Sequence, residues 1–176
     1  TRVYSKENLP IDVIISPEIE ISRSIQRKLE APGALDSVPF ADNKIRLLEI
    51  LIKDNCKSID IKFNELTKKN PKLEANVIGI NRDDKFYIPK KTESGKKGDK
   101  IYVIINSTQM SETLKAFSHE EKISKKILII GGGNIWYNLA KIIEETLENV
   151  RVKIVEKDKE RAKYLATELN NTIVIN

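Results

Sequence analysis

The sequence feature that most restricts the fold of this chain is a short apolar segment followed directly by three glycines. Residues 126–130 read Lys-Ile-Leu-Ile-Ile, the apolar pattern of a strand in a parallel sheet that is covered on both faces. Glycines occupy 131–133, and apolar residues then recur at helical spacing from Ile135 to Leu147. A strand, a glycine-rich turn and a helix in this order predict the opening of a doubly wound α/β sheet.

The same alternation continues to the end of the sequence. Residues 152–155 predict a second strand, and Asp158 is placed to cap a second helix whose apolar residues extend to Leu169. Residues 172–175 predict a third strand. The stretch 119–176 is therefore expected to form β-α-β-α-β, the first half of a Rossmann-like unit. Because the last strand ends without a following loop, we interpret the chain as a piece of a longer protein.

The glycine turn is the strongest candidate for a binding site. Gly131 would permit the tight turn, and Gly133 would allow backbone N–H groups at the start of the helix to approach a pyrophosphate. Glu156 ends the second strand, where its carboxylate is placed to accept hydrogen bonds from ribose hydroxyls. Trp136 replaces the third glycine of the usual pattern, and its indole would push the helix from the strand or tilt it. A working nucleotide site and a retained scaffold with a compromised pocket both stay open.

Residues 40–118 indicate a small α+β unit. It begins with an apolar run at 45–52 that fits a strand or a helix. A short helix is expected next, with Asp60 as its cap, Phe63 and Leu66 as its apolar residues and Asn70-Pro71 as its end. Strands at 76–81, 86–89 and 100–106 and a closing helix at 111–117 complete the unit. The turn at 82–85, Arg-Asp-Asp-Lys, predicts that the strands on either side of it form a hairpin.

The N-terminal segment contains a well-defined helix start. Residues 11–16 predict a strand, and residues 16–18 combine a capping hydroxyl, a proline at the first helical position and an acid in the first turn. The helix carries one apolar stripe, formed by Ile21, Ile25 and Leu29. It is expected to stop at 31–33, Ala-Pro-Gly. One strand and one helix cannot bury themselves, so we expect this segment to be the end of a preceding α/β domain.

The basic excess of the chain is local. Of 31 Lys+Arg and 26 Asp+Glu, residues 68–100 hold 10 basic and 5 acidic side chains, with Phe86 and Tyr87 among them. Such a stretch could contact nucleic acid, an anionic membrane surface or an acidic partner. Lysine pairs in turns are more often solvated loop tips, and this interpretation is favoured here, with no nucleic-acid partner expected.

Several classes of chemistry find no support in the composition. Cys56 is the only cysteine and His119 the only histidine of the chain. These counts exclude intrachain disulfides and His–Cys zinc sites, and no metal site is expected. Cys56 is expected to be a buried, inert thiol, and His119, beside Glu120 and Glu121, a solvated linker residue. No apolar run approaches the ~20 residues of a membrane span, and no secretory leader is visible. No nucleophile or general acid–base pair stands out, so no catalytic residue is assigned.

Several of these motifs together resemble the TrkA family, cytosolic regulators of the bacterial Trk potassium uptake system that contain two tandem RCK units, each a TrkA N lobe followed by a TrkA C lobe. The segments that carry the resemblance are 11–18 (IDVIISPE), 31–34 (APGA), 40–42 (FAD) and 130–135 (IGGGNI), with Pro89, Thr92 and 98–101 (GDKI) for the TrkA C lobe. The resemblance implies that 1–33 are the last strand and crossover helix of a first TrkA N lobe, 34–118 a TrkA C lobe, and 119–176 the first half of a second TrkA N lobe.

The resemblance also implies a fold class and a cofactor. The fold is α/β, with a small α+β TrkA C lobe flanked by the end of one Rossmann-like lobe and the first β-α-β-α-β half of a second. The cofactor is NAD(H) or an adenine nucleotide. Its expected ligands are the glycine loop, formed by Gly131, Gly133, Asn134 and Ile135, and the ribose acid Glu156.

The function implied by the resemblance is regulatory and not enzymatic. A nucleotide would shift an assembly of such subunits between conformations, with the helix 17–30 as the lever, and so gate a membrane potassium transporter. The expected partners are that transporter and further copies of the chain, joined through RCK lobes as a homodimer or higher oligomer. The expected location is the cytoplasm, peripheral at the inner face of the membrane. Two alternatives stay open: a fragment of an NAD-dependent oxidoreductase, and a dimerisation module without a ligand.

Overall fold

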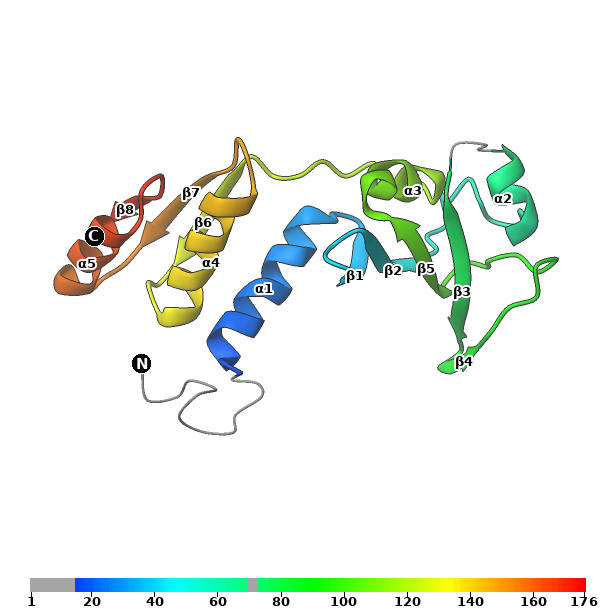
Figure 1. Ribbon diagram of the computed structural model, residues 1–176, viewed down its shortest axis with the longest axis horizontal. Coiled ribbons are helices and arrows are strands. Elements are labelled where there is room, and N and C mark those ends of the chain that lie inside the picture. The colour runs from blue at the N-terminus through cyan, green and yellow to red at the C-terminus, as the bar shows by residue number, and fades with distance from the viewer. Residues whose placement is uncertain (1–14, 70–72) are drawn as a thin grey trace. The chain divides into compact units, whose positions relative to one another are not determined.

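The computed structural model describes residues 15–69 and 73–176, and the α/β fold class expected from the sequence is confirmed (Figure 1). The chain divides into two compact units. Unit 1 combines the residues up to Gln26 with Lys125–Asn176, and unit 2 is Arg27–Ser124. The strand expected at 11–16 lies almost wholly outside the described residues.

Unit 1 is built on a parallel three-stranded sheet. Its elements are β6 (Lys126–Ile130), α4 (Asn134–Thr146), β7 (Arg151–Val155), α5 (Lys159–Glu168) and β8 (Ile173–Ile175). The strands lie in the order β6-β7-β8, with Ile129 paired to Ile154 and Ile154 to Val174. The β-α-β-α-β pattern predicted from the apolar periodicity is confirmed.

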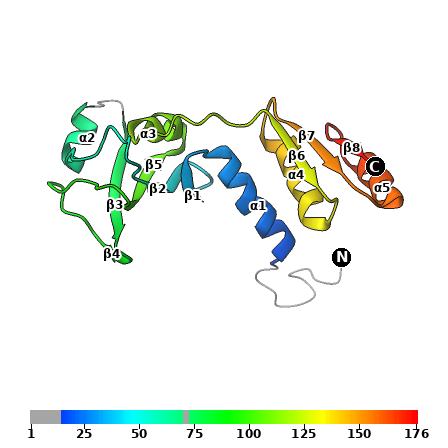
Figure 2. The same ribbon diagram turned by 180° about the vertical axis from the view of Figure 1, so that it is seen from behind.

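The residues that the structure describes cover one face of this sheet, whereas the sequence predicted a sheet covered on both faces. Alternate strand residues, such as Ile129, Val152 and Ile154, are buried together with apolar residues of α4 and α5. The views from both sides show α4 alongside β6 (Figure 1 and Figure 2). The other face carries apolar residues that remain exposed, namely Leu128, Ile130, Val155, Ile173 and Ile175. Strand β6 therefore has the apolar composition of a strand that is covered on both faces, but the described helices cover one face.

Helix α1 (Pro17–Glu30) confirms the predicted start and length of the N-terminal helix. The predicted apolar stripe is only partly covered, because Ile21 is 46% exposed while Ile25 and Leu29 are half-buried, and the fully buried residue of the helix is Ser22. The Ser22 hydroxyl lies 2.7 Å from Glu18 O and 2.8 Å from Ile135 O at the start of α4. A small hydroxyl allows the backbones of α1 and α4 to approach closely, whereas the isoleucine faces away.

Unit 2 is an antiparallel five-stranded sheet with helices on its core face. Its elements are β1 (Ala34–Phe40), β2 (Ile45–Leu51), α2 (Phe63–Lys69), β3 (Ala75–Arg82), β4 (Lys85–Tyr87), β5 (Lys100–Asn106), a 3-10 turn (Ser107–Gln109) and α3 (Met110–Ala116). The strand order is β1-β2-β5-β3-β4. The core joins inward residues of β2, β3 and β5, such as Leu48, Ile80 and Val103, to Leu66, Leu114 and Phe117 from the helices and their ends. Cys56 belongs to this core, so the prediction of a buried thiol is confirmed.

The structure resolves one ambiguity in unit 2, confirms the predicted hairpin and corrects one cap. The run at 45–52 is a strand, and the predicted hairpin is present, with Asp83 and Asp84 at positive φ in the turn. Strand β1 was not predicted. It pairs antiparallel with β2 at the edge of the sheet, a position that tolerates Pro39, which has no N–H to donate. Asp60 is not the cap of α2, because it adopts φ +62 and its N–H donates to Gly95 O.

A polar cluster around one buried carboxylate holds the long loop between β4 and β5. The Arg82 guanidinium contacts both Asp99 oxygens, at 2.9 and 2.6 Å, and lies 3.4 Å from Glu93. Tyr87 donates to the same Glu93 carboxylate at 2.6 Å, which raises the pKa of Tyr87. Asp99 is 1% exposed. This group, called below the Arg82 cluster (Arg82, Tyr87, Glu93 and Asp99), ties the end of β3 to both ends of the loop.

His119 is buried, which corrects its interpretation as a solvated residue. Its ring Nε2 lies 3.0 Å from Leu51 O, and a carbonyl only accepts, so Nε2–H is the donor. Nδ1 lies 3.4 Å from the carboxylate of Glu121, which also pairs with Lys53 at 2.9 Å. The residues after α3 are therefore fastened to the end of β2. The neighbouring acidic residues led us to expect that His119 is exposed to solvent. Its ring instead donates a hydrogen bond to the backbone of a residue 68 positions away.

Candidate functional site

The glycine turn of unit 1 leaves the start of a helix open. Gly131 adopts φ +93, a conformation that favours glycine, and its N–H donates to Val155 O at 2.8 Å. Helix α4 then begins at Asn134 with Gly133 as its N-cap, and no side chain caps it. The first turn of α4 also contains no acidic residue. The first N–H groups of a 13-residue helix, with its positive dipole end, therefore have no anionic partner from a side-chain cap.

Helix α5 of the same unit shows the contrast. Its N-cap Asp158 accepts a hydrogen bond from the Arg161 N–H at 2.7 Å, and Glu160 lies in its first turn. A carboxylate therefore already satisfies this helix start. Of the two helices that follow strands in unit 1, α4 is the one whose N-terminus can receive an anion.

Glu156 lies beside the glycine turn, as the sequence predicted. Its carboxylate accepts hydrogen bonds from the Asp158 N–H at 2.9 Å and from the Gly132 N–H at 2.6 Å. These backbone donors, Asp158 first and then Gly132, lower the pKa of Glu156 below its usual value. The structure thus brings the Glu156 carboxylate to Gly132, the middle glycine of the turn that Gly131, Gly133, Asn134 and Ile135 surround in sequence, and the lowered pKa keeps it ionised.

Arg161 is a residue of this site that the sequence did not reveal. Its Nε donates to Gly132 O at 2.8 Å and its Nη2 to the Asn134 side chain at 3.1 Å. The guanidinium also lies 5.0 Å from the centre of the Tyr164 ring. An arginine at the third position of a helix carries no sequence signal of its own, because its contacts depend on how α5 packs beside the turn.

The structure shows where helix and strand make their closest approach at the turn. A Cβ at Gly132 would lie 2.3 Å from Leu165 Cδ1 and 2.9 Å from the Glu156 carboxylate. Gly132 is therefore the glycine that close packing requires. Trp136 is 37% exposed, and the contact of α4 with the sheet is made further along the helix, where Leu139, Ala140 and Ile143 are buried. The indole is not enclosed between helix and strand.

Two classes of feature are missing from the part of the chain that the structure describes. No group of three or more His, Cys, Asp or Glu residues is placed to hold a metal ion. Within the same residues, no helix is both long and apolar enough to cross a bilayer.

The two units define a class of α/β protein in which one chain carries half of a Rossmann-like lobe with an open glycine turn and a small antiparallel α+β lobe. Residues 47–118 of the second lobe match the TrkA-C domain. The chain is 36% identical to the Trk system potassium uptake protein TrkA of Azorhizobium caulinodans, over 98% of this chain and 38% of that protein. The TrkA proteins of Haemophilus influenzae and Vibrio alginolyticus are 29% and 31% identical over similar shares of both chains.

These matches confirm the resemblance to TrkA, over nearly the whole of this chain. The chain spans less than two fifths of the length of these curated relatives. Among solved structures, the RCK domain of the GsuK channel aligns with a TM-score of 0.41 and 10% identity, over 93% of this chain and 49% of that one. A GsuK channel bound to NAD aligns with a TM-score of 0.44 and 11% identity, over 91% and 32% of the two chains.

Proposed function

We propose that this chain is part of a nucleotide-responsive regulatory subunit of a potassium uptake system, and that it is not an enzyme. Two observations support the proposal. Relatives that match nearly the whole chain are named as TrkA potassium uptake proteins. The open N-terminus of α4, beside Glu156, carries the ligand part of the proposal.

The division of the chain follows from the same proposal. Residues 1–33 would close a first TrkA N lobe, 34–118 would form a TrkA C lobe, and 119–176 would open a second TrkA N lobe. The TrkA-C match at 47–118 supports the middle part, and the βαβαβ order of unit 1 supports the last.

The proposed ligand is NAD(H) or an adenine nucleotide. Its pyrophosphate would accept hydrogen bonds from the N–H groups of Gly133, Asn134 and Ile135, for which Gly131 provides the turn. The Glu156 carboxylate would accept from ribose hydroxyls, in exchange for one of its present backbone donors. Arg161 would keep Gly132 and Asn134 in position for the phosphates.

Regulation by such a ligand is a matter of linkage. A nucleotide shifts a conformational equilibrium only by the difference between its affinities for the two states. Helix α1 spans residues of both units, so a change at the turn would reach unit 2 through it. The proposed recipient is a membrane potassium transporter, contacted from the cytoplasmic side of the membrane.

The variant Gly133→Asp is expected to abolish nucleotide binding without unfolding α4. Gly133 has φ −64, and a Cβ there would meet no atom within 4 Å, so the side chain is accommodated. Aspartate is also a favourable N-cap, but its carboxylate would occupy the anion position and repel a pyrophosphate. NADH, NAD and ATP should be titrated with Trp136, the only tryptophan, as the fluorescence reporter.

The matched control is Gly133→Ser, a neutral N-cap of similar size, which should retain binding within about threefold while the aspartate loses it. Equal binding by both variants would place the ligand elsewhere. Absence of binding to the unaltered chain would leave this lobe as a structural scaffold.

A second candidate function, pure assembly, is favoured by the exposed isoleucines of α1, Ile19 and Ile21. The variant Ile21→Lys is expected to lower the oligomeric mass in light scattering, because Ile21 is 46% exposed and would be charged at an interface. The control Arg23→Gln alters an exposed position two residues away, whose ion pair with Glu20 lies in solvent. A reduced mass with unchanged nucleotide affinity would separate assembly from ligand sensing, and an unchanged mass would exclude α1 as the contact.

A further inference from the structure

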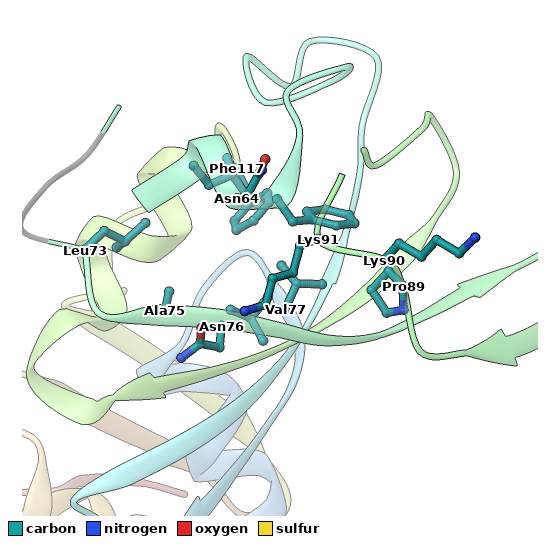
Figure 3. Close-up of a pocket in the computed structure, with 12 residues that line it drawn as sticks. Asn64, Leu73, Ala75, Asn76, Val77, Pro89, Lys90, Lys91 and Phe117 are labelled. Carbon is teal, nitrogen blue, oxygen red and sulfur yellow. The ribbon is translucent and has the colours of Figure 1, made fainter. Parts of the chain in front are cut away.

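We propose that a cavity in unit 2, distinct from the glycine turn in unit 1, binds a small planar molecule carrying one carboxylate or phosphate group. The cavity measures about 250 Å³ and lies between α2, the start of β3 and the segment 89–91 (Figure 3). This volume is below the ~300–1,000 Å³ usual for drug-sized ligands, so the ligand is small.

The floor of the cavity is apolar and belongs to the core of unit 2. Val103 is fully buried, Leu66 and Phe117 are nearly so, and Val77 packs against them. Protein interiors rarely leave voids much larger than a water molecule. A hollow of this size with buried apolar side chains beneath it can remove the apolar part of a small ligand, such as one aromatic ring, from water.

The rim of the cavity supplies positive charge and an amide. Figure 3 shows Lys91 reaching toward β3, where Val77 and Asn76 lie, whereas Lys90 extends away from the cavity. No aspartate or glutamate lines the cavity, and the nearby Glu93 carboxylate is engaged by Arg82, Tyr87 and the Lys90 N–H. A single anionic group at the edge of the ring would therefore meet an ammonium without competition from a neighbouring carboxylate.

The walls of the cavity are held before any ligand binds. The N–H groups of Phe63 and Asn64 donate to Glu93 O and Lys91 O, both at 2.9 Å, which fastens the loop to the start of α2. The Arg82 cluster holds the Glu93 side chain from the other side. A preformed cavity avoids the ordering cost that weakens binding to mobile segments.

The test is an NMR titration of the intact chain with benzoate and with benzamide, which share a ring and differ in charge. Benzoate is expected to shift the methyl signals of Val77 and Val103 saturably, and not those of Val152 in unit 1. Benzamide should bind about tenfold more weakly, because it lacks the charge that Lys91 would meet. Equal affinity for the two probes, or shifts that do not localise to these valines, would overturn the proposal.

Two variants make the test specific. Lys91→Gln should weaken benzoate binding about tenfold, while the matched control Lys90→Gln leaves it unchanged. Ala75→Leu, which fills the hollow, should abolish binding, and Gly133→Asp should not alter it. If both lysine variants lost benzoate affinity equally, general surface charge would account for the effect, and the proposed site would be contradicted. If Ala75→Leu fails to fold, the lysine pair decides the question.

Discussion

Replacing Arg82 by methionine is expected to lower the free energy of unfolding of unit 2 by about 3–5 kcal/mol. The guanidinium contacts both oxygens of Asp99, a residue that is 1% exposed, and methionine would leave that carboxylate buried with the Lys96 N–H as its remaining donor and no charged partner. The loop between β4 and β5 would also lose its contact with Glu93. Urea denaturation followed by circular dichroism, at constant m-value, measures the change.

An exposed ion pair of comparable length is the matched control. Lys97 lies 2.7 Å from Asp54, and both side chains are more than 70% exposed. Lys97→Met should therefore change stability by no more than about 1 kcal/mol. The double variant Arg82→Met with Asp99→Asn should recover part of the loss, because the buried charge is removed together with its partner. Equal effects of the Arg82 and Lys97 variants would contradict the assignment of a buried pair.

The Arg82–Asp99 pair also predicts how the stability of unit 2 depends on pH in acid. Burial of the Asp99 carboxylate opposes its ionisation, but hydrogen bonds from Arg82 and from the Lys96 N–H outweigh this and lower the pKa of Asp99. The contribution of a carboxylate with a depressed pKa is present above its unfolded value, about 3.9, and is lost as pH falls through the folded value. Without Arg82, the Lys96 N–H would be left to oppose the effect of burial on the pKa of Asp99, so the acid-unfolding midpoint of Arg82→Met should move to higher pH.

The second large effect is expected for Gly33→Ala, at about 2–4 kcal/mol of destabilisation. Gly33 has φ +99, and its added Cβ would lie 2.8 Å from the Cβ of His119 and 2.7 Å from the carboxylate of Glu121. Glu121 can rotate away. His119 cannot do so freely, because its ring is held by Leu51 O. The melting temperature and the amide signals of 119–121 report the displacement.

Gly98→Ala separates the two causes of this loss. Gly98 has φ +85, close to that of Gly33, but nothing lies within 4 Å of a Cβ added there. Its substitution should cause only the backbone strain, about 1–2 kcal/mol. The difference between the two variants measures the packing of Gly33 against His119, and equal losses would show that this packing contributes nothing.

The candidate site was partly predictable from the sequence. Gly131, Gly133 and Glu156 follow the ends of predicted strands, and residues at the carboxyl ends of parallel strands meet at one edge of a sheet. Arg161 was missed because its bonds to Gly132 cross 29 positions of the sequence and depend on the packing of α5. The role of Gly132 was missed for the same reason, since a side chain there would have to displace Leu165 and the Glu156 carboxylate. Whether the turn binds nucleotide stays a prediction.

The sequence by itself determined the features that depend on neighbours along the chain. The order of strands and helices in unit 1 followed from apolar periodicity, the start of α1 from Ser16 and Pro17, and the hairpin from the turn 82–85. Each depends on backbone preferences and periodicity that act within a few residues. Such features need no knowledge of which elements come together.

The tertiary structure alone decided which polar groups are buried and what satisfies them. Ser22 reaches Ile135 across 113 positions, His119 reaches Leu51 across 68, and Arg82 finds Asp99 across 17. A serine, a histidine and an Asp–Arg pair carry the same local signal on a surface as in a core. Only the packing of distant segments removes water from them, and a buried polar group must then find a partner within the fold.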